Sequence, residues 1–287
     1  MAKVALLTVH GMGNTERSYA DGLRQRLSSR LGAKFHDVAF CPIYYQDLLQ
    51  ANENEVWRRT DQGSKLHYDD LRKFLLFGFG DAAGLENGKE LADSTYERAQ
   101  VRIARAMLDA RRQLGGNGPV VLISHSLGCQ VLSSYVYDAQ KSITPAKTKV
   151  GIWSDIDGLA PKITDGPPLS DDEKTFLRGN TLMRWLSTGC NIPIFVAAHK
   201  TMDIKPIKPV ALPDFKWLNV FDPDDVLGWP LRPLSTEYAA LVEDRSINAG
   251  QGVVNWILKS WNPLSHMAYW DDDDAIDPLV AMLREYV

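Results

Sequence analysis

The sequence predicts an α/β protein in which a mostly parallel sheet of about six strands is flanked by helices. Short, continuous apolar runs end at turn residues, a pattern typical of strands that are buried on both faces of a sheet. Segments with helical spacing of apolar residues lie between these runs, which favours parallel strands joined by helices. The length of 287 residues is compatible with one large α/β domain.

Strand and helix patterns alternate through the first half of the chain. The run VALLTV at 4–9 predicts a buried strand, and apolar residues every four positions over 19–31 predict an amphipathic helix that ends at a glycine. HDVAFCPIYY at 36–45 predicts a second strand. A capping box predicts the start of a long helix over 94–114, and PVVLIS at 119–124 predicts the next strand.

The same alternation continues in the second half. Residues 127–137 predict a buried helix, 181–189 and 215–223 predict two strands, and 243–250 predict a weaker one. Asp277 followed by proline predicts the N-cap of a C-terminal helix.

Two segments interrupt this pattern. Residues 46–93 are polar and show no strand pattern, so we expect an inserted helical cap. Its apolar stretch FLLFGF at 74–79 either packs on the core or forms an acyl-binding wall or lid. A second, irregular insertion rich in proline and aspartate is expected at about 155–179. We therefore predict a single domain over 1–287 that carries both insertions.

Composition excludes several classes of protein. A formal net charge of −4 and the absence of a dense Lys/Arg block argue against binding to nucleic acid. The three cysteines have no metal-ligand spacing and their number is odd, so neither a metal site nor a disulfide framework is expected. No apolar stretch reaches the roughly 18 residues of a membrane span, and the N-terminal apolar run is too short for a signal peptide. A cytoplasmic protein is expected.

The stretch VVLISHSLGCQ at 120–130 joins a predicted strand to a predicted helix through two serines and a histidine. A serine at so sharp a turn projects its hydroxyl at the carboxyl edge of the sheet. The residues two before and two after it must be small because strand and helix come close there, and Ser124 and Gly128 meet this condition. Ser126 is therefore the predicted nucleophile, with an ordinary polar turn as the alternative.

The sequence HGMG at 10–13 follows the first predicted strand. A turn of this kind has backbone N–H groups that can point at a developing oxyanion. The predicted donors are the N–H of Met12 and that of Leu127, which follows the nucleophile. A plain glycine-rich turn is the alternative. A phosphate loop is disfavoured because neither Gly-x-Gly-x-x-Gly nor a Walker lysine is present.

A nucleophilic serine needs a base, and the base needs a carboxylate that orients it. His266 in NPLSHMAYW is the predicted base. The stretch VFDPDDVLGWPL offers Asp222, Asp224 and Asp225 after a predicted strand. The chain order is then Ser, Asp, His.

These four motifs resemble those of serine α/β-hydrolases of the lipase and esterase type. The resemblance implies an α/β-hydrolase fold, and it departs from the usual pattern in two ways. Ser124 stands in place of a glycine, and the two leading strands of the full fold are expected to be missing. DPDDVLGW is similar to the acid-bearing loop of intracellular phospholipase-like relatives, which favours Asp225. A more general Asp-x-Val loop would choose Asp224, and Asp222 could simply end the strand.

The resemblance implies cleavage of a small-molecule or lipid ester through an acyl-enzyme on Ser126, with neither metal nor cofactor. An amidase, thioesterase or acyltransferase with the same triad is the alternative, and an inactive binding or lipid-surface module is an alternative of another class. His125 is expected to be structural and to point away from Ser126, and His10 to order the oxyanion turn. The candidate substrate-binding residues are Phe74, Phe77, Cys190 and Trp229.

Overall fold

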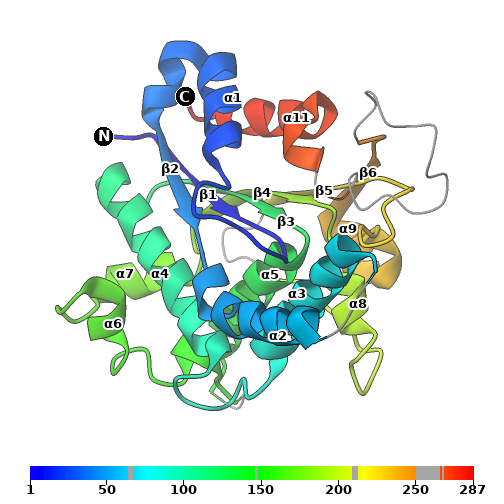
Figure 1. Cartoon of the computed structure of the whole chain (residues 1–287). Helices are drawn as coiled ribbons and strands as arrows, with labels where there is room; N and C mark the ends of the chain where they lie inside the picture. Colours follow the sequence, from blue (N-terminus) through cyan, green and yellow to red (C-terminus); the bar gives the residue numbers. More distant parts are fainter. Residues whose placement is uncertain (64–66, 146–147, 209–212, 250–265, 267) are drawn as a thin grey trace.

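A computed structural model describes residues 1–63, 67–145, 148–208, 213–249, 266 and 268–287. Its centre is a six-stranded, all-parallel sheet with the strand order β2-β1-β3-β4-β5-β6. The predicted fold class is confirmed: this is an α/β fold with helices on both faces of a parallel sheet (Figure 1), and it is consistent with the α/β-hydrolase fold. The strands are β1 (Val4–Val9), β2 (Val38–Ile43), β3 (Val120–His125), β4 (Leu182–Thr188), β5 (Lys216–Phe221) and β6 (Val242–Ser246).

The helices differ widely in length. The described α-helices are α1 (Asp21–Leu31), α2 (Gln50–Gly63), α3 (Asp69–Glu86), α4 (Thr95–Leu114), α5 (Leu127–Ser142), α6 (Ala160–Thr164), α7 (Asp171–Leu177), α8 (Ile192–Val196), α9 (Thr236–Leu241) and α11 (Asp273–Arg284). Short 3₁₀ turns span Gly32–Asp37, Gln46–Leu48, Gly151–Trp153, Arg232–Leu234 and Tyr269–Asp271. None of the helices in the described ranges is both long and apolar enough to cross a membrane.

The apolar strands are buried on both faces, as their continuous apolar runs predicted. Successive side chains of a strand point to opposite faces. In β1, Val4 and Leu6 belong to a cluster that includes apolar residues of α1 and α11. Ala5, Leu7 and Val9 of the same strand belong to a second cluster with residues of α4 and α5. Figure 1 shows the same layers, with α1 and α11 on one side of the sheet and α4 and α5 on the other.

Two local predictions were wrong. The C-terminal helix begins at Asp273 instead of near Asp277, so Pro278 lies inside it. Asp272 is its N-cap and accepts a hydrogen bond from the backbone N–H of Asp274. The run of acidic residues that precedes Asp277 thus forms the first turn, where the helix dipole favours negative charge. The stretch 155–179, expected to be irregular, contains α6 and α7.

The described residues of the segment 46–93 are mostly helical. Helices α2 and α3 make up most of it and lie side by side in Figure 1. Helix α4 follows with Ser94 as its N-cap, whose side chain accepts a hydrogen bond from the N–H of Glu97. The Glu97 carboxylate accepts a hydrogen bond from the N–H of Asp93, one residue before the position that a full capping box would use.

Candidate active site

The turn that joins β3 to α5 holds Ser126 in an uncommon backbone conformation. Its φ is 52° and its ψ is −125°. It is one of four non-glycine residues with positive φ in the part of the chain that the structure describes. Such a conformation costs about 1–3 kcal/mol and persists only where the surrounding structure imposes it. The strand-turn-helix arrangement predicted around Ser126 is therefore present, with the serine at its strained position.

Two glycines allow the chain segments around Ser126 to approach each other closely. A Cβ atom at Gly128 would lie 2.4 Å from the carbonyl oxygen of His10. A Cβ atom at Gly11 would lie 2.8 Å from the Cβ atom of Ser126. Because backbone and a short side chain cannot move away, both positions require glycine.

Ser124 occupies the position that was expected to need a small residue on the strand side. Its side chain is fully buried. The Ser124 hydroxyl accepts a hydrogen bond from Nε1 of Trp185 at 2.9 Å and lies 3.1 Å from Sγ of Cys129. Ser124 therefore connects β4 and α5. A serine fits at this position, where the serine α/β-hydrolases that the sequence resembles usually have glycine.

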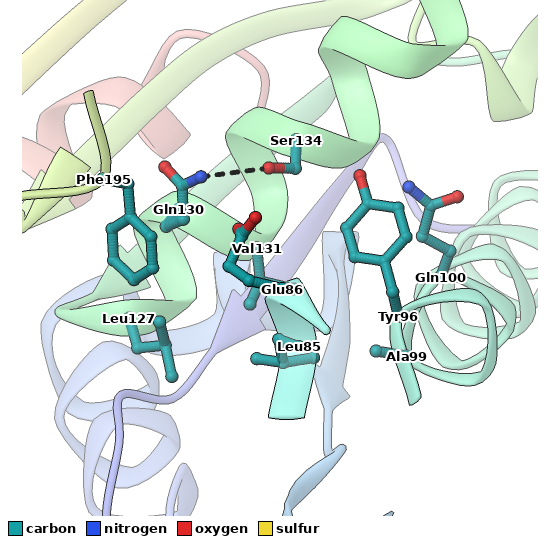
Figure 2. A pocket seen from close by; sticks show the side chains of 10 residues that line it. All are labelled: Leu85, Glu86, Tyr96, Ala99, Gln100, Leu127, Gln130, Val131, Ser134 and Phe195. Atoms are coloured by element: carbon teal, nitrogen blue, oxygen red, sulfur yellow. Dashed lines mark hydrogen bonds between the residues drawn. The ribbon is translucent and has the colours of Figure 1, made fainter. Parts of the chain in front are cut away.

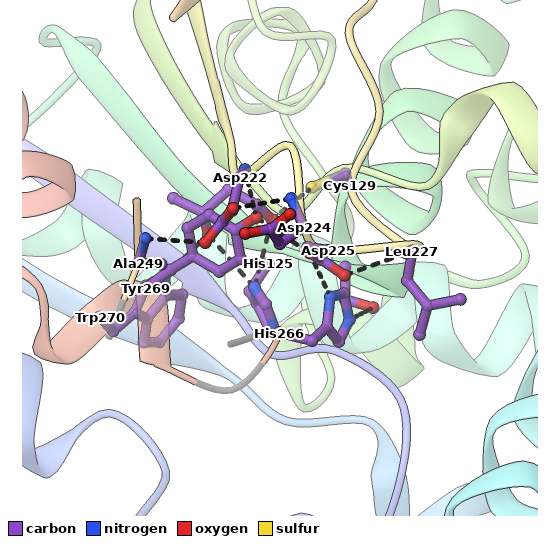
Figure 3. A network of polar contacts seen from close by, with 12 residues as sticks. His125, Cys129, Asp222, Asp224, Asp225, Leu227, Ala249, His266, Tyr269 and Trp270 are labelled. Atoms are coloured by element: carbon purple, nitrogen blue, oxygen red, sulfur yellow. Dashed lines mark hydrogen bonds and ion pairs between the residues drawn. The ribbon is translucent and has the colours of Figure 1, made fainter. Parts of the chain in front are cut away.

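The structure brings Ser126, His266 and Asp225 together in one hydrogen-bonded series. Nε2 of His266 lies 2.7 Å from Oγ of Ser126, and Nδ1 of His266 lies 2.8 Å from Oδ2 of Asp225. These residues are 140 and 41 positions apart in the chain. All three are buried, with exposed fractions of 1% for Ser126, 1% for His266 and 4% for Asp225. Figure 3 shows His266 and Asp225 within the surrounding polar network.

The three candidate carboxylates occupy different environments. Asp225 contacts His266, whereas Asp224 is exposed. Asp222 accepts hydrogen bonds from the N–H groups of Ala249 and Asp224, each at 2.8 Å, and so holds the loop after β5. Of the three, Asp225 is the carboxylate at the histidine.

Tyr269 supports Asp225, and the sequence patterns did not reveal this residue. Its hydroxyl donates to Oδ2 of Asp225 at 2.9 Å and accepts from the N–H of Asp222 at 2.8 Å. Burial raises its pKa well above the usual range, so it stays protonated and can donate. The sequence feature that could have indicated this role is the position of Tyr269, three residues after His266. It lies on the 3₁₀ turn that follows the histidine.

Hydrogen bonds keep Asp225 ionised despite its burial. Burial alone would raise its pKa, but hydrogen bonding and charge from His266, and hydrogen bonds from the N–H of Leu227 and from Tyr269, lower it below the usual value. The Leu227 N–H bond to Oδ1 is 3.0 Å long. An ionised carboxylate here favours the tautomer in which Nδ1 of His266 carries a proton, which leaves Nε2 free to accept one from Ser126.

His125 lies closer to the triad than expected. Its ring centroid is 4.7 Å from that of His266. Nδ1 of His125 lies 3.2 Å from the carbonyl oxygen of Thr188, and since a carbonyl only accepts, Nδ1 carries the proton. Burial, followed by the neighbouring His266, lowers the pKa of His125 to about 3. A neutral His125 therefore forms part of the wall beside the triad.

His10 holds the turn HGMG in place. Its Nδ1 donates to the carbonyl oxygen of Gly11 at 2.8 Å, and its Nε2 accepts from the N–H of Tyr45 at 3.3 Å. The ring also stacks on Tyr45 at a centroid distance of 4.2 Å. Burial lowers the pKa of His10 to about 4, so the imidazole is neutral and can make both contacts.

The two backbone groups predicted as oxyanion donors come from different elements. Leu127 is the first residue of α5, and the first N–H groups of a helix have no partner one turn earlier in that helix. Met12 lies in the turn after β1, and its side chain packs against α3, where a Cβ atom at Gly78 would be 2.4 Å from Sδ of Met12. The N–H of the next residue, Gly13, donates to Oδ2 of Asp81 at 2.9 Å.

The candidate substrate-binding residues do not form one group. Phe77 is buried and Phe74 is half-buried, both on α3. Cys190 is fully buried in the core, whereas Trp229 is 44% exposed. The N–H of Trp229 donates to the carbonyl oxygen of Cys190 at 2.9 Å, which joins the loops after β4 and β5.

Two hollows lie near Ser126. The one in Figure 2 is a narrow, mostly apolar crevice between α3, α4, α5 and α8, lined by Leu85, Tyr96, Leu127, Val131 and Phe195 among others. Its volume of about 10 Å³ holds about one water molecule. The other is a cavity of about 270 Å³ beside the HGMG turn, whose lining includes His10, Gly11, Met12, Tyr19, His125 and Trp270. Among the described residues, no cluster of His, Cys, Asp and Glu side chains could hold a metal ion.

The chain matches no protein-family model and no curated protein. Among solved structures it is similar to an iodinated complex of acetyl xylan esterase. The two chains are 10% identical, the TM-score is 0.42, and the alignment covers 100% of this chain and 99% of that chain. A likeness at this level supports no functional argument, so the function is argued from the geometry of the site.

Proposed function

We propose that the protein is a serine hydrolase that cleaves a carboxylic ester through an acyl-enzyme on Ser126. The observation that carries this proposal is the hydrogen-bonded series from Ser126 Oγ through His266 to Asp225, with contacts of 2.7 and 2.8 Å. A serine in a strained strand-to-helix turn, a histidine on its hydroxyl and a buried carboxylate behind the histidine together supply a nucleophile, a general base and a group that orients the base.

The proposed reaction has two halves. Ser126 Oγ attacks the ester carbonyl carbon while Nε2 of His266 takes the hydroxyl proton, and Asp225 stabilises the imidazolium that forms. The tetrahedral intermediate collapses, the C–O bond to the alcohol breaks, and His266 returns its proton to the leaving oxygen. Water then attacks the acyl-enzyme with the same base, which releases the carboxylic acid and restores Ser126.

The negative charge of both tetrahedral intermediates needs donors close to Ser126. The N–H groups of Met12 and Leu127 are the proposed donors, since both residues belong to segments that flank the nucleophile. A donor of this kind typically contributes about 2.7–4 kcal/mol to transition-state stabilisation. Binding of the ester is assigned to the cavity beside the HGMG turn, whose lining includes Met12, His125 and Trp270. Phe74 and Phe77 on α3 remain the candidates for limiting the acyl group, whereas the fully buried Cys190 is not available for contact.

The first test compares Ser126→Ala with Ser124→Ala on short p-nitrophenyl esters. Ser126→Ala should lower kcat by about 10³-fold or more because triad members act as a unit. Ser124→Ala serves as the matched control, because this neighbouring buried serine bonds Trp185 and not the triad. A fluorophosphonate should label the wild-type protein at Ser126, as peptide mapping by mass spectrometry would show.

Three outcomes would overturn the proposal: undiminished hydrolysis by Ser126→Ala, labelling at Ser124, or a folded wild-type protein that neither hydrolyses esters nor reacts with the phosphonate. The last result would favour a binding module that has the fold without turnover. Parallel assays with p-nitroanilide and thioester substrates of the same acyl group test ester cleavage against the amidase and thioesterase alternatives.

A further inference from the structure

A buried polar cluster connects α2 and α3 to the turn that follows β1. Its members are Gln46 and Asp81, both fully buried, and Glu53, which is 7% exposed. None of the three contacts the triad directly in a described hydrogen bond. The cluster nevertheless reaches the HGMG turn, because Oδ2 of Asp81 accepts the N–H of Gly13 at 2.9 Å.

Asp81 is held in a defined orientation by a second hydrogen bond. Its Oδ1 accepts from Nε2 of Gln46 at 2.8 Å, while Oδ2 faces Gly13. A hydrogen bond from a backbone N–H to an ionised carboxylate is about twice as strong as one between neutral groups. Gly13 directly follows Met12, so this contact fixes the peptide group that joins Met12 to Gly13, next to the one that carries the Met12 N–H.

The side of α3 that faces this turn is lined by glycine. A Cβ atom at Gly78 would lie 2.4 Å from Sδ of Met12, and one at Gly80 would lie 2.8 Å from Oε1 of Glu53. A side chain at either position would push Met12 or Glu53 out of its present place. The glycines thus let these two side chains pack directly against α3, next to the contact between Asp81 and Gly13.

Glu53 brings a second carboxyl group next to Asp81. Burial and the charge of Asp81 raise the pKa of Glu53 to about 8. Burial also raises the pKa of Asp81, but hydrogen bonds from the N–H of Gly13 and the amide of Gln46 oppose this rise. Asp81 accepts two N–H donors at 2.8 and 2.9 Å, whereas Glu53 accepts one at 3.4 Å. The better-solvated charge therefore lies on Asp81, and Glu53 is the member of the pair that carries the proton.

Few other groups act on this pair. Burial, and then the charge of Asp81, raise the pKa of Tyr45 well above the usual range, so its hydroxyl stays neutral. Oε1 of Glu53 and Oε1 of Gln46 are buried without a hydrogen-bond partner. Within the described residues, the hydrogen bonds and ion pairs of Asp81 and Glu53 include no Lys or Arg partner. Loss of the Glu53 proton would therefore leave two adjacent buried negative charges.

We propose that Asp81 is a positioning residue that fixes the oxyanion turn through Gly13, and that the protonated Glu53 carboxyl keeps this contact intact. The inference rests on the proposed function, because it assigns the Met12 N–H to the oxyanion. It predicts that loss of the Glu53 proton on the alkaline side weakens the bond between Asp81 and Gly13. The turn then loses its alignment, and kcat falls while KM changes little.

The test measures kcat and KM on p-nitrophenyl acetate from about pH 6 to pH 10, with the rate of Ser126→Ala subtracted as background. Wild-type kcat should fall about 10-fold or more across the upper part of this range, since a small misplacement of a catalytic group is enough for such a loss. Glu53→Gln, which has no proton to lose, should lack this fall. Glu55→Gln is the matched control, because Glu55 lies on the same helix but pairs with Arg58 and Arg59 at the surface.

Asp81→Ala should lower kcat about 10–100-fold at neutral pH, with KM changed less than about twofold. Asp81→Asn should restore most of kcat, because its amide oxygen can accept from Gly13 and its amide N–H can donate to the unpartnered Oε1 of Gln46. The Gly13 amide signal in ¹⁵N–¹H spectra provides a readout besides activity. It should titrate on the alkaline side in the wild type and stay unchanged in Glu53→Gln.

Two results would overturn the inference: an alkaline profile of Glu53→Gln identical to that of the wild type, or a Gly13 amide signal that is the same in the wild type and in Asp81→Asn at every pH. Failure of the proposed function looks different, since the wild type would then show neither hydrolysis nor labelling of Ser126 while the Gly13 signal still titrates. Should Asp81→Ala not fold, Glu53→Gln and Asp81→Asn carry the test.

Discussion

At the scale of single residues, the carboxylate of Asp225 is where the hydrogen bonds of the site converge. It accepts from Nδ1 of His266, from the hydroxyl of Tyr269 and from the N–H of Leu227. These donors offset the cost of burying a charge, which is why the pKa of Asp225 is lowered and not raised. The side chain of Asp224, its immediate neighbour, is exposed to solvent.

This difference yields a prediction for two adjacent residues. Asp225→Asn should lower kcat by about 10³–10⁴-fold, because a neutral amide neither stabilises the imidazolium nor enforces the proton on Nδ1 of His266. Asp224→Asn, the matched control, should keep kcat within about twofold of the wild type. Steady-state kinetics on one ester, with circular dichroism to verify folding, would check both. Comparable losses in the two variants would contradict the assignment of Asp225.

At the scale of elements, α3 has two different sides. Its glycines lie against the HGMG turn and α2, and Phe77 is buried while Phe79 is 70% exposed. An apolar side chain that is buried beneath α3 is a candidate for limiting the acyl group, whereas one in solvent is not. In the sequence, FLLFGF is one continuous apolar stretch. In the helix, some of its side chains are buried and others are exposed to solvent.

The division of α3 allows a sharp test of its role as a cap. Phe77→Ala, and to a smaller extent Phe74→Ala, should shift the preference among p-nitrophenyl esters of increasing chain length more than they change kcat on the acetate. Phe79→Ala should leave that preference unchanged, since its side chain faces solvent. If Phe77→Ala lowers only the melting temperature and keeps the wild-type chain-length profile, α3 contributes packing alone.

At the scale of the whole molecule, the site depends on both layers of helices. Ser126 directly precedes α5 on one side of the sheet, while His266 lies shortly before α11, which packs on the other side (Figure 1). The contact between them therefore forms only when both helices are docked on the same sheet. Helix α11 is held by buried apolar residues, including Ile276, Leu279 and Leu283.

Docking of α11 can be weakened without touching the site. Leu283→Ala should reduce the free energy of unfolding by about 2–5 kcal/mol, because it leaves a cavity at a fully buried position. Ala281→Ser, on the exposed side of the same helix, should change it by less than about 0.5 kcal/mol. Urea unfolding followed by circular dichroism measures both. Equal stability of the two variants would mean that α11 is not part of the cooperative core.

Local patterns in the sequence were sufficient for the strands, for the helices α1, α4 and α5, and for the turn around Ser126. Each of these depends on residues that are close in the chain: continuous apolar runs, apolar residues every three or four positions, and small residues beside a sharp turn. The same patterns predict the start of the C-terminal helix too late. Proline after Asp277 is typical of a first turn, but the acidic residues at 272–274 form the actual N-cap and first turn.

The sequence by itself determined the sharp turn at Ser126, the need for glycine at position 128, and the order of the candidate residues Ser126, Asp225 and His266. Each of these depends only on residue type and local spacing. Only the tertiary structure decided which carboxylate meets His266, that Tyr269 supports it, that His125 lies beside it, and that Asp81 reaches the turn after β1. The physical reason is that these contacts join residues far apart in the chain. Asp225 and His266 are 41 positions apart, Asp225 and Tyr269 are 44 apart, and Gly13 and Asp81 are 68 apart. Their geometry is set by how helices and loops pack around one sheet, and no periodicity within a single segment encodes that packing.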